Sequence, residues 1–179
     1  MCVIIVKKKG AKMPTKHFLK MAFRANHDGC GFVSDHDSYK SLSFEDFYRR
    51  LKNVRTDENC IIHFRWATHG SVRVENCHPF TQNGIYFAHN GILDISPVGD
   101  MTDSETWFRY VFMRFYDDPR EAYDMASVEA QLTGSKFAFL DGGEVRLYGN
   151  FTEYSKGLYL SNLRFLPWPA QRAFYYSYA

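Results

Sequence analysis

The feature that most constrains the fold is the apolar run that directly follows the second residue. Residues 3–6 read Val-Ile-Ile-Val, all β-branched, and the run ends at three lysines, residues 7–9. Unbroken runs of this kind are typical of a strand that is buried on both faces. We therefore expect a strand over residues 2–6 that holds Cys2 rigidly at its start. The lysines are expected to form a solvated turn.

The aromatic content indicates a packed core. Aromatic residues make up 17% of the 179 residues, with 16 Phe and 12 Tyr. Large buried rings offset the entropy that is lost when a backbone is ordered, so this composition argues against disorder. A chain of this length is an ordinary size for a single unit. With no repeat, linker or low-complexity stretch, we expect one α+β domain over residues 1–179.

Charge and cysteine usage limit the possible partners. The 22 basic and 20 acidic residues give a net charge of +2, too small a field to indicate nucleic acid as the main partner. No signal peptide is recognised, and no segment approaches the ~20 apolar residues of a membrane helix. Four cysteines without a secretion signal indicate reduced thiols. We expect a cytoplasmic protein that binds neither nucleic acid nor a membrane.

Hydrophobic periodicity and capping residues predict the remaining elements. Helices are expected over residues 14–25, over 43–52 with Ser43 as the N-cap, from Thr102 or Asp103 as far as Phe115, and after Pro119. Strands are expected from Phe32, over 60–65, over 85–88, near 158–160, and as a hairpin of 136–140 with 144–148. The sheet segments deliver polar residues at their ends, where sites usually lie.

Three polar stretches at predicted strand ends, residues 65–70, 75–80 and 89–91, accompany Cys2. Together they supply a thiol nucleophile, oxyanion donors and a cation that can hold a carboxylate. Removal of Met1 would free an α-amine beside the thiol, and an unperturbed α-amine, with a pKa of about 8, can serve as the local base. The structural alternative is that Cys2 is a small buried hydrophobe at the start of a strand.

Read in order, five motifs resemble those of the class II glutamine amidotransferases, members of the N-terminal nucleophile hydrolase superfamily. They are Cys2 after the initiator Met, residues 26–32 (H-x-D-G-x-G), residues 65–80 (R-x-A-T-x-G…E-N-x-H-P-F), residues 87–91 (F-A-H-N-G) and residues 102–105 (T-D-S-E). Each motif alone is weak, because Asn-Gly and Gly-x-Gly are common turns. The resemblance covers most of the first 110 residues and is greatest to the stand-alone bacterial branch. Val3 departs from a frequent glycine, and Cys30 from a frequent aromatic residue.

The resemblance implies a four-layer αββα sandwich of two stacked, mainly antiparallel sheets. It also implies that the Cys2 thiolate attacks the side-chain amide of L-glutamine, releasing ammonia and leaving a γ-glutamyl thioester that water hydrolyses to glutamate. The Asn90 side-chain amide and the Gly91 N–H would stabilise the oxyanion. As a plain turn, Asn90-Gly91 would fit a hairpin equally well. No cofactor and no metal are implied.

Substrate recognition is implied for residues around the same site. The Arg65 guanidinium would bind the α-carboxylate through two parallel hydrogen bonds, and Asp103 would pair with the α-ammonium. The alternatives are a surface ion pair for Arg65 and a helix N-cap for Asp103. Thr68 and His69 would add polar contacts, and Trp66 would screen the site as residues 65–80 close over it. The chain length leaves the ammonia acceptor to a separate synthase or acceptor-binding subunit.

Three other interpretations remain open. The same nucleophile could cleave another amide or transfer a γ-glutamyl group. A binding module whose chemistry has lapsed would retain the fold without activity. A zinc protein could use Cys and His ligands, although their spacing lacks the paired motifs of known zinc sites; the candidates are Cys60, His63, His69, Cys77, His78 and His89. His63 alternates with apolar neighbours and is more simply an interior histidine.

Overall fold

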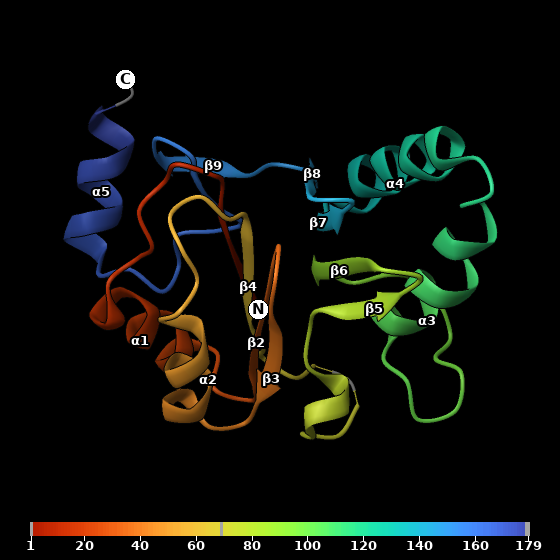
Figure 1. Ribbon diagram of the computed structural model, residues 1–179, viewed down its shortest axis with the longest axis horizontal. Coiled ribbons are helices and arrows are strands. Elements are labelled where there is room, and N and C mark those ends of the chain that lie inside the picture. The colour runs from red at the N-terminus through yellow and green to blue at the C-terminus, as the bar shows by residue number, and fades with distance from the viewer. Residues whose placement is uncertain (1, 69, 178–179) are drawn as a thin grey trace.

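Two antiparallel sheets lie face to face, and helices cover the outer face of each (Figure 1). The computed structural model describes residues 2–68 and 70–177. Every strand pairing in these ranges is antiparallel. This arrangement confirms the αββα sandwich that the resemblance implied. Within the same ranges, no helix combines the length and the apolar character needed to cross a bilayer.

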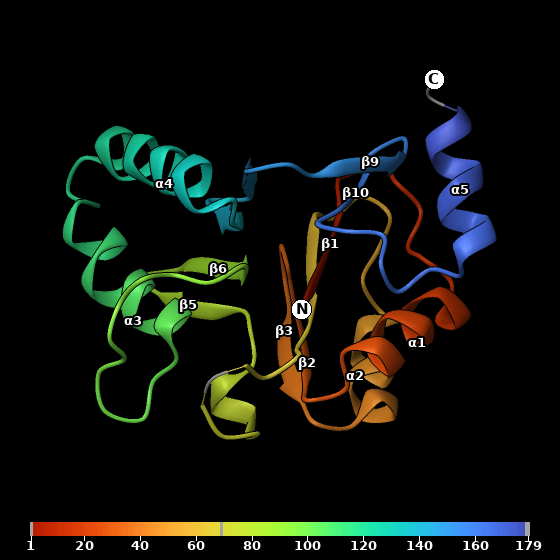
Figure 2. The ribbon, with the colours of Figure 1, turned by 180° about the vertical axis from the view of Figure 1, so that it is seen from behind.

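The larger sheet has six strands and the smaller has four. The larger sheet runs in the order β3 (Ser38–Ser41), β2 (Cys30–Ser34), β4 (Cys60–Phe64), β1 (Val3–Lys7), β10 (Leu158–Leu160) and β9 (Thr152–Ser155). The smaller runs β5 (Phe80–Gln82), β6 (Ile85–Asn90), β7 (Lys136–Asp141) and β8 (Glu144–Tyr148). Strand β1 therefore lies inside the larger sheet, hydrogen-bonded to β4 on one side and β10 on the other (Figure 2).

Helices pack in two groups. Those over the larger sheet are α1 (Lys16–Ala25) and α2 (Phe44–Leu51), with α5 (Trp168–Ser177) stacked against β9 through Phe174 and Tyr154. Those over the smaller sheet are α3 (Asp103–Tyr110) and α4 (Pro119–Thr133), together with the 3-10 turn η2 (Phe112–Arg114). A further 3-10 turn, η1 (Val74–Asn76), lies in the loop that joins the two sheets.

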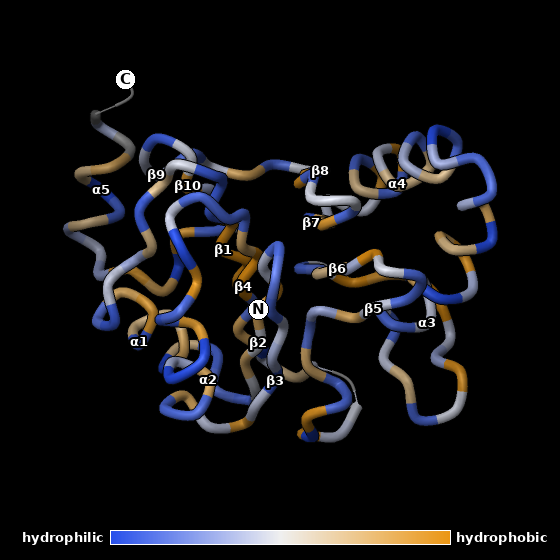
Figure 3. Tube along the Cα trace, viewed as in Figure 1, coloured by the Kyte–Doolittle hydropathy of each residue, from blue (hydrophilic) through white to orange (hydrophobic). Residues whose placement is uncertain are grey.

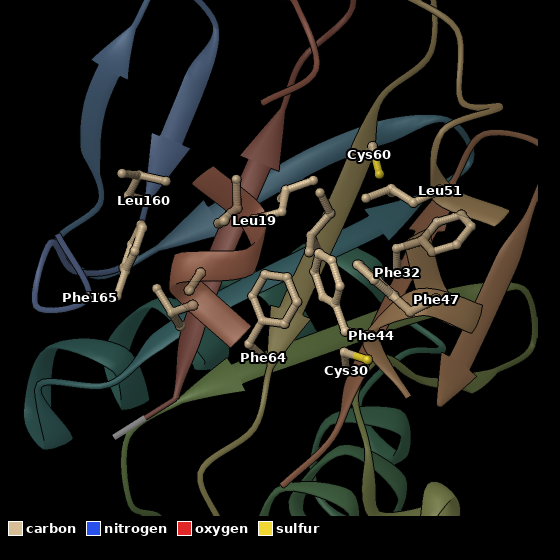
Figure 4. Close-up of a cluster of buried hydrophobic side chains, with 14 of the residues drawn as sticks. Leu19, Cys30, Phe32, Phe44, Phe47, Leu51, Cys60, Phe64, Leu160 and Phe165 are labelled. Carbon is tan, nitrogen blue, oxygen red and sulfur yellow. The ribbon is translucent and has the colours of Figure 1, made fainter. Parts of the chain in front are cut away.

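The pleat of β1 sends its side chains into two different layers. Val3 and Ile5 join the cluster beneath α1 and α2, which also holds Phe47 and Phe64 (Figure 4). Ile4 and Val6 join the cluster between the two sheets. All are fully buried, and the apolar colouring of β1 and β4 in Figure 3 marks this interior. The prediction of a strand buried on both faces is confirmed.

Capping side chains determine where the helices begin. Ser43 caps α2, as predicted, and of the two predicted candidates Thr102 caps α3; each hydroxyl accepts a backbone N–H from three residues on. Helix α1 begins two residues later than predicted, because Thr15 is its cap and accepts from Phe18 N. Helix α3 stops at Tyr110 instead of Phe115, and η2 follows it.

Four short elements were not predicted: β3, β5, β9 and α5. Strand β9 has exposed polar residues at alternate positions, and β3 is a short, mostly polar segment, so neither carries an alternating apolar signal. Strand β5 has only three residues and follows the polar stretch 75–80 closely. Each of these strands forms because a neighbouring strand offers an edge to pair with, which is a tertiary effect.

Lys7 corrects the expectation of a solvated lysine turn. Its side chain is fully buried at the end of β1. The ammonium donates to three backbone carbonyls, at 2.9 Å to Arg55 O, 2.9 Å to Thr56 O and 2.6 Å to Glu58 O. Burial lowers the pKa of Lys7, and the nearby Glu58 counters that effect. Lys7 therefore holds the 55–58 loop to the central strand, and its charge is not available to a partner.

Replacing Lys7 with Met should destabilise the fold, because three carbonyls lose a charged donor while the apolar stem is retained. We expect the free energy of unfolding to fall by about 3 kcal/mol. Urea unfolding followed by circular dichroism measures this change. Lys12→Met, at an exposed position, is the control and should leave the midpoint unchanged. Equal stability of the two variants would contradict the anchoring role.

Candidate active site

The thiol of Cys2 lies at the start of the central strand and is held by the backbone of Trp66. Trp66 N donates to Sγ at 3.3 Å, and Sγ lies 3.5 Å from Trp66 O as a donor. Asn162 Nδ2 donates to the Cys2 carbonyl at 2.9 Å. Burial raises the pKa of the Cys2 thiol, partly offset by the Trp66 N–H. The thiol is thus positioned firmly and stays protonated at neutral pH unless a base acts on it.

Asn90 ends β6 and is tied to β1 through one serine. Its Nδ2 donates to Ser161 Oγ at 2.8 Å, and the same Oγ accepts from Ile4 N at 2.8 Å. Ser161 N in turn donates to Ile4 O at 2.9 Å. Ser161 therefore fixes the Asn90 amide relative to a residue two positions from Cys2. Sequence reasoning missed Ser161 and Asn162, which follow the last strand without a recognisable motif.

Gly91 has no room for a side chain. A Cβ at this position would collide with Ser135 Oγ and would lie 2.8 Å from His89 Nε2. The backbone of residue 91 therefore packs directly against the start of β7, and glycine is required there for a close approach. This places the Gly91 backbone beside Asn90 on the wall of the pocket at Cys2.

Two adjoining pockets meet at Cys2. A narrow one of about 40 Å³ is lined by Arg65, Thr68 and Asp103, among others, and a wider one of about 330 Å³ is lined by Asn90. Four residues line both pockets: Cys2, Trp66, Thr68 and Gly91. Every predicted site residue within the described ranges thus lines one pocket or both. His69 lies outside the described residues, as does Met1.

Arg65 and Asp103 approach the narrow pocket from different layers. Arg65 follows β4 directly and is 3% exposed; its Nη1 donates to Ser71 O at 2.9 Å, so it also holds the following loop. Asp103 is the first residue of α3, and its carboxylate accepts from Leu93 N at 3.2 Å and Ser104 Oγ at 3.2 Å. Thr102, not Asp103, is the N-cap of α3. A cation and an anion therefore line the pocket together.

The motif at residues 26–32 supports this loop from beneath. Asp28 Oδ2 accepts from Ala67 N at 2.8 Å, and Asp28 N donates to Arg65 O at 3.0 Å. A Cβ on Gly29 would collide with Cys77 Sγ, and one on Gly31 with His78 O. Asp28, Gly29 and Gly31 therefore shape the backbone beside the loop that holds Cys2.

A cluster of three buried histidines adjoins the narrow pocket, and His78 and His89 are among its lining residues. His63 Nε2 is 3.1 Å from His89 O, and the ring centroids of His63 and His78 are 4.2 Å apart. His89 contacts Ser104 Oγ through Nδ1 at 2.8 Å and Ser135 Oγ through Nε2 at 3.1 Å. Burial lowers the pKa of His63 to about 3 and of His89 to about 4, and it lowers the pKa of His78 well below its usual value. All three rings are neutral at pH 7.

The zinc interpretation finds no support in this arrangement. Across residues 2–68 and 70–177, no group of three or more His, Cys, Asp or Glu side chains is placed to hold a metal ion. Cys60 pairs with Lys7 at the far end of β4, whereas His63 pairs with Ile4. His63 bonds instead to a carbonyl and His89 to two serines, so His63 is the interior residue that its alternation indicated.

Asn76 and His78 line the narrow pocket and were not among the predicted site residues. Both lie in residues 75–80, which sequence reasoning assigned to the loop without individual roles. Asn76 is fully buried, and its Nδ2 donates to Ser71 O at 3.0 Å. The signal was present in the E-N-x-H-P-F motif, but spacing alone could not say which of its side chains faces the pocket.

Comparisons with known proteins agree with this geometry. A model of the family described as class-II glutamine amidotransferases matches residues 22–139. Over 50 residues the chain is 42% identical to a glutamine–fructose-6-phosphate aminotransferase (isomerizing) of Xylella fastidiosa, covering 28% of this chain and 8% of that protein. A protein of the same name from Buchnera aphidicola is 50% identical over 34 residues, covering 19% and 6%. The matched stretches thus span less than a tenth of the length of these relatives.

A solved structure is similar in fold. The glutamine phosphoribosylpyrophosphate amidotransferase of B. subtilis, complexed with ADP and GMP, superposes with a TM-score of 0.54 at 18% sequence identity. The similarity covers 89% of this chain and 41% of that chain. It therefore extends beyond residue 110, where the sequence motifs end, and includes most of both sheets.

The buried histidines predict a steep acid dependence of stability. Their pKa values are lowered in the folded state, so only the unfolded chain takes up these protons below about pH 6.5, and the stabilisation is lost as pH falls. His78→Leu removes one such group and should reduce the slope of unfolding free energy against pH by about 1.4 kcal/mol per unit. Urea titrations from pH 7.5 downward test this. The exposed His17→Gln is the control; equal slopes for His78→Leu and wild type would refute the interpretation.

Proposed function

This chain belongs to the class II glutamine amidotransferases, and we propose that residues 1–179 form one glutaminase domain that hydrolyses the side-chain amide of L-glutamine through Cys2. The observation that carries the proposal is the meeting of two pockets at the Cys2 thiol. Arg65 and Asp103 line one pocket and Asn90 the other. This is the set that cleavage of an α-amino acid amide requires: a nucleophile, oxyanion donors and two opposite charges.

The nucleophile needs a local base. Because burial raises the pKa of the Cys2 thiol, an α-amine freed by removal of Met1 would take its proton as Sγ attacks the amide carbon. The tetrahedral intermediate then expels ammonia as the C–N bond breaks, and the α-ammonium returns the proton to the leaving nitrogen. A water molecule attacks the resulting thioester, which releases glutamate and restores the thiol.

The oxyanion would be stabilised by Asn90 and Gly91. An amide nitrogen has two hydrogens, and Nδ2 of Asn90 directs one of them to Ser161 Oγ. The second can meet the oxyanion together with the Gly91 N–H. Donors that are fixed before the reaction avoid a reorganisation cost, and the loss of one typically costs about 3 kcal/mol. The buried Ser161 contact supports such a fixed orientation.

Substrate recognition would rest on Arg65, Asp103 and Thr68. A guanidinium has five N–H donors, so Arg65 can hold the Ser71 carbonyl and the α-carboxylate of glutamine at once. Asp103 would receive the α-ammonium. Trp66, 43% exposed at the junction of the pockets, would limit water access when residues 65–80 close, with His69 adding a polar contact.

The ammonia acceptor would be bound elsewhere. The relatives' names describe transfer of nitrogen from glutamine to a second compound, and this chain spans only a small share of their length. We propose that a synthase or acceptor-binding unit, carried by a separate chain or segment, receives the ammonia. Transfer of the γ-glutamyl group to an amine is the alternative outcome at the same thioester.

Incubation of the processed protein with glutamine tests the proposal through release of glutamate and ammonia. Cys2→Ala should lower the rate to below about a thousandth of wild type, because no thioester can form. Cys60→Ala removes a buried thiol at the far end of β4 and should retain activity. Turnover that survives Cys2→Ala would eliminate the mechanism, and a γ-glutamyl adduct in place of glutamate would identify a transferase.

A loss of activity in an Arg65 variant would be ambiguous, because Arg65 also bonds the loop that follows it. The test therefore compares two substrates that differ only at the α-carboxylate. Arg65→Ala should lower kcat/KM for glutamine by about 100-fold, the cost of one charged bidentate contact. With glutamine whose α-carboxylate is replaced by an amide, kcat/KM of the variant should be little lower than that of wild type. Wild type that does not distinguish the two substrates would contradict the assignment.

Ser161→Ala should act on the chemical step, because Asn90 loses the partner that orients it. We expect kcat to fall about tenfold with KM unchanged. Thermal unfolding of the variant reports the separate cost of leaving Ile4 N without its acceptor. Ser155→Ala, at an exposed position of β9, is the control. A rise in KM alone would show that Ser161 does not position Asn90.

A further inference from the structure

A separate cleft of about 320 Å³ shares no lining residue with either pocket at Cys2. It lies where the edge strands β3 and β5 of the two sheets come close (Figure 1). The volume falls within the range of small-molecule sites, about 300–1,000 Å³. None of its residues is assigned a contact with the thiol or with glutamine.

The cleft is lined by two cations and by no acidic residue. Lys40, on β3, is partly buried, and its ammonium donates to the Glu75 carbonyl at 3.1 Å, which leaves two of its three donors. Burial lowers the pKa of Lys40; the nearby Glu105 and Glu75 raise it, and the charge of Arg109 lowers it. An anion between the two cations would relieve that repulsion.

Arg109, on α3, is held in place with donors to spare. Its Nε donates to Glu105 at 2.8 Å, and Nη1 reaches Thr81 O at 3.4 Å and Gln82 Oε1 at 3.3 Å. Among the described residues, none accepts a hydrogen bond from Nη2. An anchored guanidinium loses little entropy when it binds an anion, and its planar fork matches phosphate oxygens.

Aromatic side chains also line the cleft. The Lys40 ammonium lies 5.2 Å from the centroid of the Phe80 ring, and Tyr39 and Tyr86 are half-buried lining residues. Such walls pack against the flat body of a small ligand while the cations hold its charged end. The chemistry therefore favours a ring that carries an anionic group over a bare ion.

We propose that this cleft binds a small ring-bearing phosphate monoester, held at the phosphate by Lys40 and Arg109, and that its occupancy restrains the loop over Cys2. Val74 and Pro79 line the cleft, whereas Asn76 and His78 of the same loop line the catalytic pocket. A ligand that packs against Val74 and Pro79 thus limits movement of the residues between them. The proposed binding does not depend on the glutaminase proposal. The proposed effect on the loop does rest on the glutaminase proposal.

Isothermal titration calorimetry of the full chain at constant ionic strength tests the binding claim with phenyl phosphate as the probe. Phenyl phosphate should bind at one site per chain, and inorganic phosphate, benzoate and phenol should each bind about tenfold more weakly or worse. Lys40→Met and Arg109→Met should each weaken phenyl phosphate by about tenfold or more. Lys52→Met, at an exposed position on the end of α2, controls for net charge.

Each contrary result overturns a defined part of the proposal. Benzoate that binds as tightly as phenyl phosphate would overturn the choice of phosphate, and equal weakening by Lys52→Met would reduce the effect to net charge. If Arg109→Met does not fold, the result for Lys40→Met is decisive by itself. Lys40 lies on an edge strand, where we expect the substitution to be tolerated. Phenyl phosphate should also lower the KM for glutamine severalfold in wild type and not in Lys40→Met. Binding without that change would overturn the coupling to the loop.

Discussion

The pairing of β1 on both sides is the interaction on which the rest of the structure depends. The strand is hydrogen-bonded to β4 and β10, and its side chains enter the helix-covered cluster and the inter-sheet cluster alternately. A strand fixed in this way cannot slip by one residue, because a slip would exchange the two buried faces. Cys2 directly precedes this strand, so its backbone is held in a fixed position.

The groups around Cys2 are anchored to the same strand. Asn162 bonds the Cys2 carbonyl, and Ser161 bridges Ile4 to Asn90, so residues between 71 and 160 positions apart share one small network. The buried histidines that adjoin the narrow pocket are neutral at pH 7, because burial disfavours their charged form. Arg65 and Asp103 therefore dominate the charge lining this pocket, which suits recognition of a zwitterionic amino acid.

Much of the fold followed from local patterns. The buried strand that follows Cys2, the Ser43 cap, a helix start at Thr102 or Asp103, and the hairpin β7–β8 were predictable because periodicity and capping are local physical effects. The missed strands β3, β5 and β9 exist because a neighbour offers an edge. Lys7 was misjudged for the same reason, since the three carbonyls that bury it belong to a loop about 50 residues away.

The sequence by itself determined which chemical groups are present and in what order, and hence the family: a cysteine at position two, an Arg65 loop, Asn90-Gly91 and Asp103. Only the tertiary structure decided which groups share a pocket, that Asn76 and His78 face it, and that Ser161 and Asn162 support it. The tertiary structure also brought Lys40 and Arg109 together in a cleft that no sequence motif predicts. The physical reason is that motifs record spacing along the chain, whereas orientation arises from packing two sheets against each other, and that packing joins residues with no local signal in common.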